Sequence, residues 1–158
     1  MNVTLEQGIA AAVRFILDND VEGTKPYFEE IPEAFYVPSV YFPVPYMAAE
    51  KVTLSSFVNN ITFEARIMAG TDWDAQARAA NLRDLIIFNN LAVPVYESDG
   101  TDSGWSIKVT EPFIRRLEQG IVLLSFTILD YFTPAESAGR LKANDIHLIW
   151  NRIEEIYS

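Results

Sequence analysis

Residues 121–132 constrain the fold more than any other stretch, because they alternate along their whole length and are nevertheless rich in apolar groups on both sides. Alternation with a period of two is typical of a β-strand. A strand that is apolar on both faces is expected at the centre of a sheet, or beneath a neighbouring subunit that covers its second face. One face is mixed and the other wholly apolar, the apolar face comprising Val122, Leu124, Phe126 and Ile128.

A second long strand is predicted over residues 56–69, where apolar and polar residues also alternate. Its apolar side includes Phe63 and Ile67, and its polar side includes Glu64 and Arg66, which is typical of a half-buried antiparallel strand. Shorter strands are predicted for residues 92–96 and 105–109, with turn-forming residues 98–100 between them.

Helical periodicity recurs in three places. Apolar residues three and four positions apart predict a first helix over residues 5–16 and a last, amphipathic helix over residues 146–157. Between them, Thr71 is predicted to cap a helix in which Asp72 and Asp74 lie at the positive end of the helix dipole. The buried stripe of this middle helix is predicted to be Ala75, Ala79, Leu82 and Ile86.

The proline-rich segment 36–45 follows a polar stretch, residues 21–33, that is predicted to be a solvated connection. Its aromatic and β-branched residues favour a strand, but three prolines cannot all donate to a central ladder, so an edge strand or an extended arm is predicted. Other chains attach at sheet edges, although proline also blunts an edge against pairing, and both interpretations stay open. The candidate interface residues of this segment are Pro38, Tyr41, Phe42 and Pro43.

These segments predict a single domain over residues 1–158 of the α+β class. Its sheet is expected to be mainly antiparallel, with helices packed on it and an amphipathic helix at the C-terminal end. Residues 115–120 are predicted to be a charged link between strands, in which Arg115 and Arg116 concentrate positive charge in an acidic chain. We interpret the two arginines as a salt-bridged turn, or as a contact with an acidic neighbour or with passing DNA.

The composition excludes several functional classes. The 158 residues contain no cysteine, which excludes disulfides, thiolate metal sites and a cysteine nucleophile. The net charge of −10 leaves little to gain from counterion release, so tight wrapping of nucleic acid is not expected, although DNA can pass by. No apolar run approaches the roughly 18 residues of a membrane helix, and the first residues lack the basic region of a signal peptide. A soluble protein made in the cytosol is therefore expected.

The sequence predicts no catalytic, cofactor or metal site. His147 is the only histidine and falls on the polar side of the last helix without a partner cluster, so it is neither a good base nor a metal site. Glu97, Asp99 and Asp102 do not match the spacing of a calcium loop and are interpreted as an acidic turn. No glycine-rich phosphate loop or glycine-framed nucleophilic serine is present. We therefore predict that the chain is not an enzyme.

In their order, these motifs resemble the tail terminator (tail completion) proteins of long-tailed bacteriophages. The resemblance covers about residues 31–134 and rests on the segment 38–43 followed by Pro45, on residues 93–100, and on Ile107-Lys108 with the segment 116–120. The chain continues beyond it with some two dozen residues that end in the last helix. That helix is expected either to cover the sheet or to reach a neighbour.

The resemblance implies a structural virion protein, a small α+β subunit that forms a ring, usually a hexamer. Such a ring caps the finished tail tube and presents the tail to the head connector, while DNA passes through its centre. Its partners would be further copies of itself, the tail tube protein and connector or neck proteins, with no membrane. The protein would be made in the host cytoplasm and reside in the tail or neck of the virion.

The candidate interface residues Asp99, Asp102, Arg115 and Arg116 are assigned to contacts of this kind, and the acidic turn is expected in the lumen or at an interface. Another neck, head-completion or tail-tube subunit is the first alternative. The second is a small monomeric binding module, or an enzyme whose site is built from backbone groups.

Overall fold

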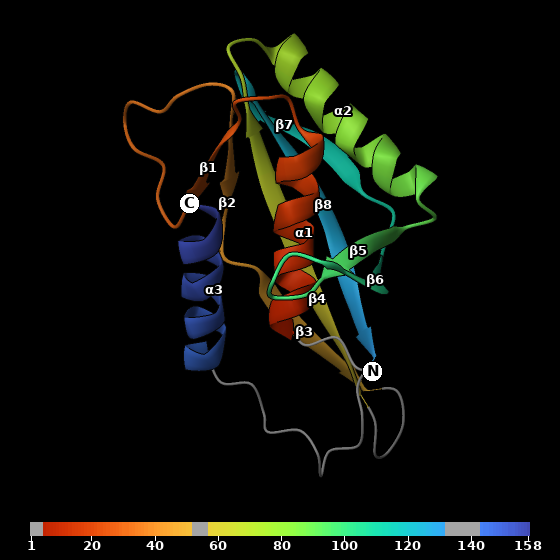
Figure 1. Cartoon of the computed structure of the whole chain (residues 1–158). Coiled ribbons are helices and arrows are strands. Elements are labelled where there is room, and N and C mark those ends of the chain that lie inside the picture. Colours follow the sequence, from red (N-terminus) through yellow and green to blue (C-terminus); the bar gives the residue numbers. More distant parts are fainter. Residues whose placement is uncertain (1–4, 52–56, 132–142) are drawn as a thin grey trace.

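The computed structural model describes residues 5–51, 57–131 and 143–158, whose path is drawn in Figure 1. The predicted helices at the beginning, middle and end of the chain are confirmed. In this part of the chain the elements are α1 (Leu5–Asn19), β1 (Lys25–Phe28), β2 (Ser39–Phe42), β3 (Tyr46–Lys51), β4 (Phe57–Met68), α2 (Asp72–Phe88), β5 (Ala92–Tyr96), β6 (Asp102–Val109), β7 (Phe113–Glu118), β8 (Ile121–Tyr131) and α3 (Ala143–Tyr157).

The strands form one mixed sheet in the order β1-β2-β4-β8-β6-β5, with β3 paired to β4 and β7 paired to β8. Every pairing is antiparallel except that of β1 with β2. The longest runs between β4 and β8, from Val58 opposite Tyr131 to Met68 opposite Ile121. The predicted α+β class and the central position of β8 are confirmed, while Phe132, the last residue of the predicted strand, lies outside the described residues.

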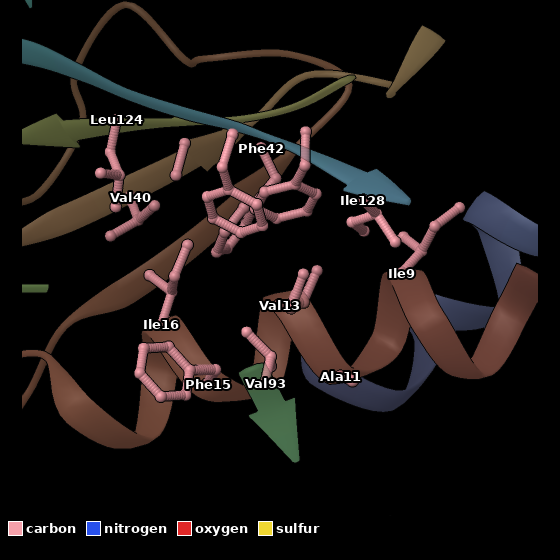
Figure 2. Packing of buried hydrophobic residues seen from close by; sticks show 14 of the residues in the cluster. Ile9, Ala11, Val13, Phe15, Ile16, Val40, Phe42, Val93, Leu124 and Ile128 are labelled. Atoms are coloured by element: carbon pink, nitrogen blue, oxygen red, sulfur yellow. The ribbon is translucent and has the colours of Figure 1, made fainter. Parts of the chain in front are cut away.

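The core lies between the helices and one face of the sheet. Figure 2 shows side chains of α1 directed at strand residues that include Phe42, Leu124 and Ile128. The buried hydrophobic residues of all three helices belong to this one cluster, so within the described residues the helices cover the same face, which we call the helix side. The members from α2 are the four predicted stripe residues, and those from α3 are Ile149, Trp150 and Ile153.

The structure places α3 on the sheet. Trp150 is fully buried, and its ring meets that of Phe28 on β1 edge to face, with 5.6 Å between centroids. The last helix was expected either to cover the sheet or to reach a neighbour, and in the structure it covers the sheet. Not all of the predicted apolar stripe is buried, because Ile156 near the helix end is 67% exposed.

The prediction that the segment around β2 is an edge strand is wrong. Lys25–Phe28, within the stretch expected to be a solvated connection, forms β1 and pairs in parallel with β2, whose other side pairs with β4. The prolines do not oppose this arrangement, because Pro38 precedes β2 and Pro43 follows it. Only Pro26 stands inside a strand here, and its strand β1 is the sheet edge, where proline is tolerated.

The predicted charged link is also a strand. Phe113–Glu118 forms β7 and pairs with β8 through a tight hairpin at Gln119-Gly120. Gly120 has φ +76°, a left-handed conformation that suits glycine. Charged residues are tolerated in β7 because its pairing with β8 is its only strand pairing among the described residues, so it lies at a sheet edge.

Candidate subunit interface

The sheet face opposite the helices carries the side chains that alternate with the core residues, and we call it the open face. On β2, for example, Tyr41 lies between the buried Val40 and Phe42. The strand register then aligns one row across the sheet on this face, from β1 to β7: Tyr27, Tyr41, Arg66, Leu123 and Arg115. Within residues 5–51, 57–131 and 143–158, no helix packs on this row.

The positive charges divide sharply between the two sides of the sheet. Five arginines of the described part form ion pairs, and each pair has at least one member on a helix: Arg14–Asp18, Arg78–Asp20, Arg83–Asp84, Arg116–Asp72 and Arg152–Glu6. The four other cations with described side chains make no ion pair with a described carboxylate. By strand register all four lie on the open face, and they are Lys25, Arg66, Lys108 and Arg115.

Arg66 lies at the centre of the open face. Its guanidinium lies over the ring of Tyr41, 5.5 Å from the centroid, and its Nε is shielded from solvent. That Nε has no hydrogen-bond partner among the described residues. A buried donor left without an acceptor costs about 1–3 kcal/mol, so the site favours an acceptor brought by another molecule.

Aromatic side chains surround these cations. At the β1 end, the Nζ of Lys25 lies over the rings of Tyr27 and Tyr36, at 5.4 and 5.0 Å from their centroids. Tyr46 on β3 is 60% exposed and Phe113 on β7 is 54% exposed, and both share the side of the open row. Tyrosine, phenylalanine and arginine are enriched at protein interfaces, so this composition is typical of a protein-binding surface.

The predicted interface residues around β2 lie in different environments. Tyr41 lies on the open face and donates its hydroxyl hydrogen to the carbonyl of Glu29, at 3.0 Å. Pro38 and Pro43 are partly exposed at the two ends of the strand. Phe42 is fully buried in the core, so its prediction as an interface side chain is wrong, because the alternation of β2 directs it to the helix side.

Arg115 and Arg116 lie on opposite sides of the sheet, because neighbours in a strand point in opposite directions. Arg116 pairs with Asp72 at the start of α2, with 3.1 Å between Nε and Oδ2. Arg115 is exposed on the open face, opposite Leu123. The salt-bridged interpretation therefore describes Arg116, and contact with an acidic neighbour stays a prediction for Arg115.

Asp72 joins α2 to the β7–β8 hairpin. Its carboxylate accepts hydrogen bonds from the backbone N–H of Gly120 and from Arg116. The Gly120 bond is the larger cause that lowers the pKa of Asp72, and the charge of Arg116 also lowers it. The neighbouring residue Thr71 caps α2 as predicted, since its hydroxyl accepts from the N–H of Asp74 at 3.1 Å.

The acidic turn between β5 and β6, residues 97–102, lies beside α1 on the helix side (Figure 1). The Oδ1 atom of Asp99 accepts from both the N–H and the hydroxyl of Thr101, at 2.9 and 2.7 Å, and these bonds lower the pKa of Asp99. Asp102 begins β6 and accepts from the N–H of Gly104. A groove of about 700 Å³ lies beside the turn, between α1 and the end of α3.

Lys25 and Lys108 were not predicted to be site residues, and Arg66 was predicted only to lie on the polar side of a strand. That alternation was the available signal for Arg66. The grouping of the three cations with Arg115 depends on strand order, which the sequence does not reveal. Two exposed aromatic residues were missed as well, Trp73 and Phe88 at the two ends of α2, which are 82% and 88% exposed.

The described residues contain no group of three or more histidine, aspartate or glutamate side chains arranged to hold a metal ion. His147 is exposed on α3, and its Nε2 lies 3.4 Å from the side-chain amide of Asn151. Among the helices of the described part, none is long and apolar enough to span a membrane.

No protein-family model matches the chain, and no curated protein does. The solved structures that match include a chain described as "Virion of native gene transfer agent (GTA) particle". It is 16% identical, with a TM-score of 0.42, and the match covers 81% of this chain and 95% of that chain. At this level of similarity, a functional assignment has to rest on the residues of this chain.

Proposed function

We propose that the chain is a structural subunit of a phage-like virion, the tail terminator, which forms a ring on the end of the tail tube. The observation that carries this proposal is the open face, which holds the unpaired cations of the described part, among them Arg66 with its orphaned Nε. Such a surface favours a protein partner that supplies acceptors. The specific role is supported by the motifs of residues 38–43, 93–100 and 116–120 that resemble tail terminators.

The expected assembly is a hexamer that joins the tail tube to the connector or neck proteins, within the tail or neck of a virion made in the host cytoplasm. Six copies with a charge of −10 each would carry about −60, so the ring would repel phosphates and let DNA pass without retaining it. The role requires no cofactor, metal or catalytic group. Besides Tyr41 and Arg115, the proposed contact residues include Pro38, Pro43, Asp99, Asp102 and Arg116.

Light scattering coupled to size exclusion, followed by negative-stain microscopy with purified tail tubes that lack a terminator, tests the proposal. The expected result is a ring in solution that binds one end of each tube. A strict monomer that ignores tail tubes would contradict the proposal. Binding along the tube, or to heads alone, would favour another tail-tube or neck subunit instead.

A further inference from the structure

We infer that the open face of one subunit docks on the helix side of a second copy of this chain, with the acidic turn of residues 97–102 as its counterpart. The inference rests on the proposed function, because it supplies the contact that would build the ring. It concerns two surfaces of one chain, and its basis is charge complementarity between them.

The two surfaces carry opposite charge. Among the described side chains, the open face presents the four unpaired cations and, by strand register, two carboxylates, Glu64 and Glu118, in a chain whose net charge is −10. Beside α1, Glu97 and Asp99 make no ion pair with any described cation, and neither does Asp102 at the start of β6. The excess of negative charge therefore lies away from the open face.

The carboxylates of the turn are held in place before any partner arrives. Both hydrogen bonds to Asp99 use its Oδ1, and the bond to Asp102 also uses Oδ1, which leaves each Oδ2 without a described partner. A fixed carboxylate with a free oxygen is a suitable acceptor for a guanidinium or ammonium group.

The charges disfavour pairing of the open face with itself. Its described side chains include four unpaired cations but only two carboxylates, so two open faces in contact would leave positive charges facing one another, which is repulsive. Contact between two different surfaces of one chain is heterologous, and such contacts close into rings when the rotation between subunits permits. The charge pattern therefore favours the type of contact that a ring requires.

Two charge-reversal variants test the inference. In the open-face variant, Lys108→Glu is combined with Arg115→Glu, and in the turn variant, Glu97→Lys is combined with Asp102→Lys. The side chains changed in the open-face variant, Lys108 and Arg115, are exposed and make no side-chain hydrogen bond or ion pair with a described residue, so this variant is expected to fold. Circular dichroism and thermal melting verify folding of both variants. Arg83→Glu combined with Asp84→Arg, which exchanges the two members of an ion pair on α2 and keeps the net charge, serves as the control.

Each variant alone is expected to associate at least about tenfold more weakly than the unaltered chain, because one of its two surfaces is repulsive. An equimolar mixture of the two variants should regain association, because the unaltered open face of the turn variant meets the unaltered turn of the open-face variant, and the two reversed surfaces also carry opposite charges. The control should assemble like the unaltered chain. Raising NaCl from 0.1 M to 1 M shortens the Debye length from about 10 to about 3 Å, so it should also weaken association.

A turn variant that assembles like the unaltered chain would overturn the inference, and so would a mixture that does not regain association. If either result were obtained while the unaltered chain still formed rings, it would contradict only the inferred contact and not the proposed function. An unaltered chain that stays monomeric under all conditions would contradict both.

Discussion

The substitution Arg78→Met is predicted to destabilise the fold more than any change of an exposed charge. Arg78 on α2 binds both oxygens of Asp20, with Nε–Oδ1 and Nη2–Oδ2 distances of 2.8 and 2.6 Å. Its Nη1 donates to the carbonyl of Met68 at 2.7 Å and its Nη2 to that of Ser39 at 3.3 Å. One guanidinium thus joins the end of α1 to α2, β2 and β4.

The magnitude follows from the burial of this pair. The side chains of Arg78 and Asp20 are 7% and 1% exposed, so methionine would leave a buried carboxylate without its counter-ion. Removing one partner of a buried ion pair costs about 3–5 kcal/mol. A domain of this size is stable by only about 5–15 kcal/mol, so the variant should lose much of its stability. Adding Asp20→Asn removes the unpaired charge and should recover about 1–2 kcal/mol.

Urea unfolding followed by circular dichroism measures these values by linear extrapolation. Arg83→Met is the matched control, because Arg83 on the same helix pairs with Asp84 at the surface, where an ion pair contributes at most about 1 kcal/mol. A loss of less than about 1 kcal/mol for Arg78→Met, or a loss equal to that of Arg83→Met, would refute the reasoning.

Three further predictions concern other contacts. Asp72→Asn should lower the melting temperature at pH 7, and the difference from the unaltered chain should vanish at low pH. The pKa of Asp72 is lowered in the folded state, so its carboxylate stabilises the fold at pH values above the ordinary pKa of 3.8. That contribution is lost as the pH falls through the lowered pKa of the folded state. Equal melting temperatures at pH 7 would contradict this. Trp150→Ala should lower the free energy of unfolding measured in urea by about 3–5 kcal/mol, because Trp150 of α3 is fully buried in the core. A near-neutral result would contradict the packing of α3 against the core. Gly120→Ala should destabilise more than Gly23→Ala in thermal melts, because both have positive φ but only at Gly120 would a Cβ lie 2.6 Å from a backbone oxygen, that of Ala69. Equal effects would contradict the clash.

Elements with strong local periodicity could be predicted from the sequence. The strands β4 and β8 show the period of two, and α2 shows the period of 3.6 together with its cap at Thr71. These signals depend on residues close together in the chain, so they survive without knowledge of the neighbours. The central place of β8 was one of the two predictions made from its two apolar faces, the other being cover by a neighbouring subunit, and the strand order confirms the central place.

Strand order could not be read in the same way. β1 is four residues long and interrupted by proline, and it is a strand because β2 offers a partner. The error at β1 produced the error at Phe42, since an assumed edge suggested an exposed aromatic residue. The Arg78–Asp20 pair joins residues 58 positions apart, and no local pattern indicates such a contact.

The structure changes what the two-sided apolar pattern of β8 says about partners. Leu123 and Ser125 on the open face are 4% and 3% exposed although no described helix covers them, so their burial does not by itself require a neighbouring subunit. The case for a neighbour rests instead on Arg66 and Arg115, which lie opposite Leu123 from the two flanking strands. A purely apolar partner would desolvate both guanidinium groups without compensation, which is costly. A partner for this face must therefore bring carboxylates to both sides of a narrow apolar centre.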